Sequence, residues 1–178
     1  MPSESQPVRI DFAQMPSVEF GGSLIGRAAL AVAIDELKKG AQEIGGKNSG
    51  PWVRKYLNGM AVEGASWCAG FVSFCFANNG HPMPFNYTVS ARDLLNQFKS
   101  KNWSYELGDG IAPEPGDILV WWRNGPENWQ GHAGITHCFC DGSLFTIEGN
   151  RTTKVAGFAY NLKTMTNLLG FGRVPVAA

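Results

Sequence analysis

Two apolar segments joined by a tight turn constrain the fold of this chain more than any other feature. Gly131–Cys140 and Ser143–Glu148 have the composition of strands, and the dipeptide between them, Asp141-Gly142, favours a two-residue β-hairpin. Ile118–Trp122, just upstream, reads as a buried strand that follows a Pro-Gly-Asp turn. We therefore expect an antiparallel sheet here, with 155–160 and 169–174 as candidates for further strands.

Segments with helical periodicity precede the sheet. Gly40 is a typical helix stop, Pro51 suits a first helical position, and Ser66 and Ser90 are candidate N-caps. Helices followed by antiparallel strands predict an α+β fold. The helices are expected over 27–39, 51–57, 67–78 and 90–99.

The length of 178 residues suits one domain, and the chain has no internal repeat or dividing linker. We expect a single domain over 25–178, preceded by an N-terminal arm over 1–24. Within the arm, 8–12 alternates for long enough to form a short strand, although a partly ordered arm is the simpler interpretation.

Charge and hydropathy exclude several classes of function. Fifteen basic residues balance fifteen acidic ones, which argues against nucleic-acid binding. No apolar run approaches about 18 residues, so we expect no membrane span. Residues 1–20 lack a basic segment followed by an apolar one, so we expect synthesis in the cytoplasm without a signal peptide.

The four cysteines are spaced unfavourably for local disulfides. Cys68 and Cys75 would lie about 10.5 Å apart on one helix, beyond the roughly 7 Å that a disulfide allows between Cα atoms. Cys138 and Cys140 are two apart in a strand, which is an awkward geometry for a bridge. We expect four free thiols, three of them buried, and no zinc site, because neither pair has C-x-x-C spacing.

Cys68 is the candidate nucleophile. A cysteine in the first turn of a helix has a lowered pKa, because the exposed N–H groups there favour a thiolate. The same N–H groups could bind the oxyanion of a tetrahedral intermediate. The alternative is a buried structural cysteine at the start of a helix.

Three histidines compete for the role of the base. His81 lies in a Gly-His-Pro loop, where an exposed side chain is the ordinary outcome. His132 and His137 are five apart in one strand, so they point to opposite faces. We favour His132, because the small residues Ala133 and Gly134 leave room for a substrate or a helix beside it.

An imidazole that acts as a base needs a polar partner on its other nitrogen. Glu148 and Asn150 end an apolar strand that the hairpin pairs with the His132 strand. They share a face if the chain is extended there. The alternative is an ordinary turn at the end of the strand.

Three ordered motifs resemble those of the CHAP family of cysteine- and histidine-dependent amidohydrolases and peptidases, which cleave bacterial cell walls. They are Ser-Trp-Cys-Ala-Gly-Phe-Val-Ser at 66–73, Gly-His-Ala-Gly-Ile at 131–135 and Ile-Glu-Gly-Asn at 147–150. Pro-Gly-Asp-Ile at 115–118 and Glu-Ile-Gly-Gly-Lys-Asn-Ser-Gly at 43–50 extend the resemblance to roughly 25–173.

The resemblance implies a papain-like fold in which the cysteine helix packs on an antiparallel sheet. It implies Cys68 as nucleophile, His132 as base, Glu148 as the group that orients the imidazole, and Asn150 as the last member of a polar tetrad. The expected reaction is hydrolysis of an amide in peptidoglycan: a stem peptide, a cross-link or the muramoyl–alanine bond.

This chain departs from the family pattern in two respects. Some members bind calcium through an acidic loop before the cysteine helix, but Glu63 is the only carboxylate in that region here, so we expect no metal and no other cofactor. Many members carry a separate wall-binding module, and we expect none within these 178 residues. Substrate contacts would then come from the domain itself, and the candidates are Trp67, Trp121, Trp122 and Trp129.

Two alternative functions stay open: a non-catalytic binding module, and a cysteine peptidase or amidase that acts on a protein other than the wall. The enzyme would reach the wall after release during phage lysis or after injection by a secretion apparatus. In the second case an immunity protein is an expected partner. We expect a monomer.

Overall fold

Four α-helices form in the first part of the chain, within the described residues 3–175 of this computed structural model. Their bounds are Leu24–Lys39 (α1), Pro51–Leu57 (α2), Cys68–Ala77 (α3) and Ala91–Ser100 (α4). Three short 3-10 helices, Phe12–Gln14, Leu107–Asp109 and Leu162–Thr164, lie between the larger elements. The α2 prediction is confirmed to the residue, and the others are confirmed within one to three residues.

Local capping explains where the helices start and stop. α1 begins three residues earlier than predicted because the Ser23 side chain accepts a hydrogen bond from the Gly26 N–H. Gly40 ends it in the left-handed conformation. Ser90 caps α4 as predicted. The prediction for Ser66 is wrong: Trp67 holds the N-cap position of α3, and it makes no side-chain cap bond.

The described part of the chain forms one seven-stranded sheet in which each pair of neighbours is antiparallel. The predicted hairpin is confirmed, because Asp141 and Gly142 both adopt positive φ between β4 and β5. The strand order is β1-β6-β5-β4-β3-β7-β2. The strands are Val8–Ile10 (β1), Ser104–Tyr105 (β2), Ile118–Trp122 (β3), Gly131–Cys140 (β4), Ser143–Glu148 (β5), Ala156–Asn161 (β6) and Leu168–Gly172 (β7).

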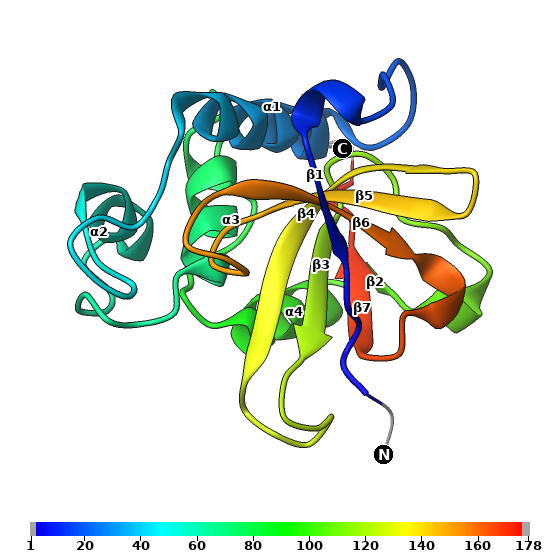
Figure 1. The fold of residues 1–178 in the computed structure, drawn as a ribbon. Helices are drawn as coiled ribbons and strands as arrows, with labels where there is room; N and C mark the ends of the chain where they lie inside the picture. The colour runs from blue at the N-terminus through cyan, green and yellow to red at the C-terminus, as the bar shows by residue number, and fades with distance from the viewer. Residues whose placement is uncertain (1–2, 176–178) are drawn as a thin grey trace.

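The N-terminal arm runs along the edge of this sheet (Figure 1). β1 pairs with β6, and Met15 is buried where Gly157 leaves room for its side chain. The predicted arm over 1–24 therefore contributes a strand to the sheet and ends where α1 begins at Leu24. Residues 1–2 of the arm and 176–178 of the predicted domain lie outside the described range.

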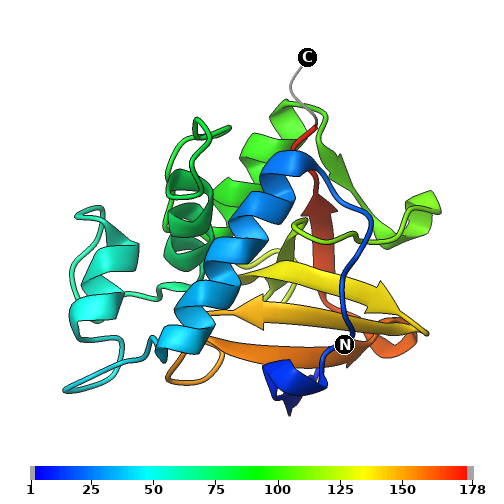
Figure 2. The ribbon, with the colours of Figure 1, turned by 90° about the horizontal axis from the view of Figure 1, so that it is seen from above.

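The helices bury one face of the sheet. α1 and α3 pack on β4, α4 packs on β3, and α2 lies outside α3, away from the strands (Figures 1 and 2). α3 approaches α2 closely at Gly70, where a Cβ atom would lie 2.5 Å from the carbonyl oxygen of Tyr56. The predicted α+β class is confirmed, with the helix that begins at Cys68 packed on the antiparallel sheet.

The cysteines follow the prediction: all four are free thiols, and Cys68, Cys75 and Cys138 are buried. In residues 3–175 no helix has both the length and the apolar character that a membrane crossing requires.

Candidate active site

Cys68 is the first residue of α3 and is only 3% exposed. Burial by itself raises the pKa of the thiol, but the neighbouring His132, the Ala133 backbone N–H and the Ser66 hydroxyl together lower that pKa to about 7. The Ser66 oxygen lies 3.9 Å from the sulfur. A substantial share of Cys68 is therefore thiolate at neutral pH.

His132 is the histidine that the fold brings to Cys68. It is buried at the start of β4, and its Nε2 lies 2.7 Å from Glu148 Oε1. Because that nitrogen is held by the carboxylate, Nδ1 is the one left to exchange a proton with the thiol. β3 pairs Trp121 directly with His132, and their ring centroids are 5.7 Å apart, so the indole forms one wall of the site.

His137 has a different environment on the same strand. Its Nε2 donates to the carbonyl oxygen of Pro16 at 3.0 Å, and its ring meets Phe12 edge-on. Burial lowers the pKa of His137. Within the described residues its Nδ1 has no hydrogen-bond partner. His137 thus packs against the N-terminal arm, and the expected preference for His132 agrees with the geometry.

Glu148 ends β5 and has no exposed surface. Its two oxygens also accept hydrogen bonds from Thr146, Arg151 and Tyr160, at 2.5 to 2.7 Å. Burial raises the pKa of this carboxyl, but the charge of Arg151 and the bond to His132 outweigh burial and bring it to about 2. Glu148 is therefore a fixed anion behind the imidazole.

Gly134 makes the contact between Glu148 and His132 possible. A Cβ atom at position 134 would lie 2.7 Å from Glu148 Cγ, so any larger residue would displace the carboxylate. The small residue was expected to leave room for a substrate or a helix. In the structure it leaves room for the glutamate that holds the base.

Arg151 is a part of the site that the sequence analysis missed. Its Nε donates to Glu148 Oε1 at 2.7 Å, and its side chain is 14% exposed. The guanidinium lies over the rings of Trp121, Phe158 and Tyr160, with distances of 5.4 to 5.8 Å to the centroids. The i, i+3 spacing from Glu148 was the only sequence clue, because the ring contacts depend on the folded sheet.

Asn150 contributes to the site in a different way from the predicted tetrad. Its side-chain N–H donates to Ser66 Oγ at 2.7 Å, so it reaches the loop before Cys68 and not the imidazole. The left-handed backbone of Asn150, with φ 66°, turns the chain out of β5 at this point. The amide thus ties together the segments that carry Cys68 and Glu148.

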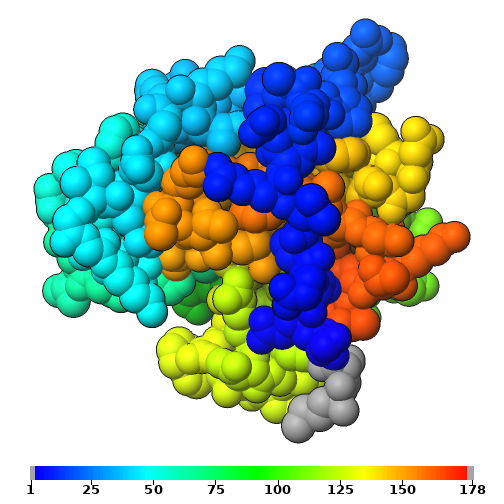
Figure 3. Space-filling model, in the orientation of Figure 1, coloured from blue at the N-terminus to red at the C-terminus, as the bar shows by residue number. Residues whose placement is uncertain are grey.

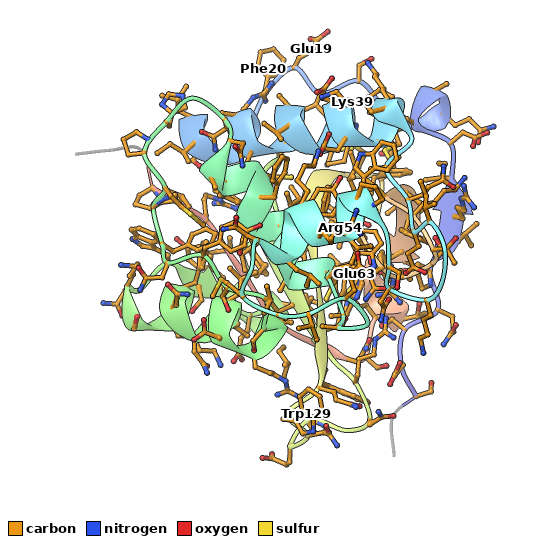
Figure 4. All side chains as sticks on the ribbon, turned by 90° about the vertical axis from the view of Figure 1, so that its left-hand side faces the viewer. Glu19, Phe20, Lys39, Arg54, Glu63 and Trp129 are labelled. Carbon is orange, nitrogen blue, oxygen red and sulfur yellow. The ribbon has the colours of Figure 1, made fainter. Side chains whose placement is uncertain are left out.

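Three of the four tryptophans predicted to contact substrate lie in the core. Trp67 and Trp121 have no exposed surface and Trp122 retains 6%. Trp67 stacks on Tyr56, and its N–H donates to Glu43. The prediction is therefore wrong for these three, because their side chains fill the interior. Trp129 is 81% exposed and projects from the β3–β4 loop (Figure 4).

In residues 57–66, just before α3, Glu63 is the only carboxylate. Glu63 is ion-paired with Arg54 at the surface (Figure 4). Across residues 3–175 the structure shows no cluster of three or more histidine, cysteine, aspartate or glutamate side chains that could hold a metal.

Alkylation of Cys68 should accelerate as pH rises through about 7, because only the thiolate reacts. The measurement is the rate of iodoacetamide labelling at Cys68, followed by peptide mass spectrometry from pH 5 to 10. His132→Ala removes the imidazole and should move the midpoint to or above the ordinary thiol value of 9.0. Burial raises the pKa of Cys75, which therefore serves as an internal control that labels slowly. A wild-type midpoint near 9.0 would contradict this account of Cys68.

Comparison with known proteins gives a family match and a distant likeness of fold. The model of the CHAP domain family matches residues 60–150, just over half of the chain. Two crystal structures of Ly7917 are similar, one of them with the hydrolysing product of MDP. That one has 14% identity and a TM-score of 0.47, covering 85% of this chain and 62% of that chain. The other has 13% identity and a TM-score of 0.44, covering 83% and 61%.

This chain spans less than two thirds of the length of those structures. A comparison with curated proteins found no match.

Proposed function

We propose, from the premise that this chain belongs to the CHAP domain family, that it hydrolyses an amide bond of peptidoglycan with Cys68 as nucleophile. The observation that carries the proposal is the line of contacts from a thiol with a pKa near 7 to His132 and on to a buried, anionic Glu148. A nucleophile, a base and a group that orients the base are the parts that amide hydrolysis by a thiolate requires.

The first half of the reaction forms a thioester. His132 Nδ1 takes the proton of the thiol, and the Cys68 sulfur attacks the amide carbonyl carbon. The negative charge that develops on the carbonyl oxygen is stabilised by the unpaired N–H groups at the start of α3. The tetrahedral intermediate then loses its amine, which leaves with the proton held by His132.

The second half releases the acyl group. His132, now neutral, removes a proton from a water molecule that attacks the thioester carbonyl carbon. The carbon–sulfur bond breaks, the thiol is restored and the product leaves as a carboxylic acid. In both halves Glu148 stabilises the imidazolium, and Arg151 with Tyr160 holds the carboxylate in place.

Hydrolysis of purified sacculi tests the substrate class. We expect the protein to release soluble muropeptides from sacculi while leaving casein intact under the same conditions. Cleavage of casein without release from sacculi would favour a peptidase that acts on other proteins. Inactivity on both would favour a binding module and overturn the proposal.

The proposed site of action is the bacterial cell wall. Release during phage lysis or injection by a secretion apparatus would bring the protein there, and an immunity protein is the partner expected in the second case. A monomeric enzyme is also expected, which size-exclusion chromatography with light scattering tests.

A further inference from the structure

A hollow of about 390 Å³ opens beside the candidate nucleophile. Ser66, next to the Cys68 sulfur, lies in its wall, and so does Gly131, which precedes His132 in β4. Lys47, Asn48 and Asn150 also line a second, neighbouring hollow of about 650 Å³. Segments around 47, 123–131 and 150 all reach the face of the molecule shown in Figure 3.

The first hollow is lined by two cations and no carboxylate. Lys47 is exposed and Arg123 is half-buried. Among residues 3–175 neither has a carboxylate within salt-bridge distance. The second hollow differs, because Glu43 and the Glu148-bound Arg151 line it. Two cations without a salt-bridge partner therefore lie on one side of the nucleophile, and the Glu4 carboxylate beside them is bonded to the Asn124 N–H at 3.0 Å.

Hydrogen bonds from Arg92 hold in place the loop that carries Arg123 and Trp129. Arg92 of α4 donates to the carbonyl oxygens of Gln130 at 3.0 Å and Pro126 at 2.9 Å. Trp129, 81% exposed, thus stands on an anchored loop beside the hollow. An exposed aromatic on a fixed backbone is a typical ligand contact.

We infer that this hollow is the subsite for a carboxylate-bearing peptide segment of the substrate, with Lys47 and Arg123 as specificity-determining residues. The inference rests on the proposed function and specifies which part of the substrate the site recognises. The stem peptides of peptidoglycan carry free carboxylates near their amide bonds, and a carboxylate between these two cations would form charge-assisted hydrogen bonds. A wall whose carboxylates are amidated would lose those bonds.

The test compares native sacculi with the same sacculi after carbodiimide-mediated amidation of their carboxylates with ammonia. Wild-type enzyme is expected to release muropeptides from native sacculi about 10-fold faster, a preference of about 1.4 kcal/mol. Lys47→Ala and Arg123→Ala should each reduce the rate on native sacculi and leave the rate on amidated sacculi unchanged. Lys99→Ala, an exposed cation on α4, is the matched control and should keep the full preference.

The salt dependence of the preference for native sacculi distinguishes a charge interaction from a purely structural role of Lys47 and Arg123. The preference of the wild type should shrink as NaCl rises above about 0.1 M, where the screening length falls below roughly 10 Å. Arg123→Lys should retain much of the preference, because it keeps the charge. Equal rates on both walls, for wild type and variants alike, would overturn the subsite while leaving the hydrolase intact. Absence of release from either wall would overturn the proposed function and this inference with it.

Discussion

Replacing Cys68 by alanine is expected to reduce the release of soluble muropeptides by at least about 10³-fold. The sulfur is the only atom at the start of α3 that can form the thioester, and no other residue of the site can take its place in the attack. The fold should survive, because alanine favours the helix and removes a single heavy atom, a loss of about 1 kcal/mol at most. Release from sacculi and thermal unfolding by circular dichroism, measured on one preparation, check both parts.

Cys75→Ala is the matched control for that experiment. Cys75 lies on the same helix and is fully buried, but burial raises its pKa so that it stays a thiol. We expect full activity with a modest loss of stability. Activity retained by Cys68→Ala, with a native unfolding transition, would remove Cys68 from the mechanism.

Glu148→Gln is expected to lower kcat by about 10²–10⁴-fold. The amide cannot stabilise the imidazolium by charge. Its N–H₂ group would replace one of the two oxygens and so face either the donors Thr146 and Tyr160 or the pair His132 and Arg151 in place of an acceptor. Removing the anion also leaves the Arg151 guanidinium largely buried without its partner, which costs about 3–5 kcal/mol of stability. Steady-state kinetics at a temperature well below the unfolding midpoint separate the loss of rate from the loss of fold.

Glu148→Gln should also change how the free energy of unfolding depends on pH. The folded pKa of Glu148, about 2, lies below its ordinary value of 4.5, so its stabilisation is complete above pH 4.5 and is lost as pH falls towards 2. Urea unfolding between pH 2 and 6 should show a smaller dependence in Glu148→Gln than in wild type. Glu63→Gln, at a surface ion pair, should resemble wild type in both assays. If Glu148→Gln kept the wild-type kcat, Glu148 would be excluded as the group that orients the base.

Local sequence determined most of the elements that carry the site. Pro51 sets the start of α2, and the Asp141-Gly142 turn sets the register of β4 against β5, so those bounds were predicted to the residue. A β-bulge between Thr136 and Cys138 shifts that register by one residue. The shifted pairing, which the turn alone does not predict, is the one that places Glu148 across from Gly134 and near His132. The pairing of β1 with β6 could not be predicted, because it joins residues about 150 apart in the sequence.

The predictions for the site were wrong or incomplete where a contact depends on how distant segments pack against one another. The motif does not reveal which face of the sheet a tryptophan occupies. Trp121 was predicted to contact substrate, although it lies between His132 and Tyr160 and stacks on Tyr160. Arg151 and Tyr160 meet Glu148 only after β6 has folded back beside β5. Asn150 was expected to complete a polar tetrad with the imidazole, but its partner is Ser66, on a loop whose course no local pattern predicts.

If a Cys68 thiolate cuts an amide bond of peptidoglycan, one oxygen atom of water enters the new carboxyl group. Digestion of purified sacculi in water enriched in ¹⁸O, followed by mass spectrometry of the soluble products, tests it most directly. We expect products with a new amine and a matching new carboxyl that carries one ¹⁸O atom, and none of these with Cys68→Ala. Products with new sugar ends and no new amine, or the same labelled products from Cys68→Ala, would contradict it.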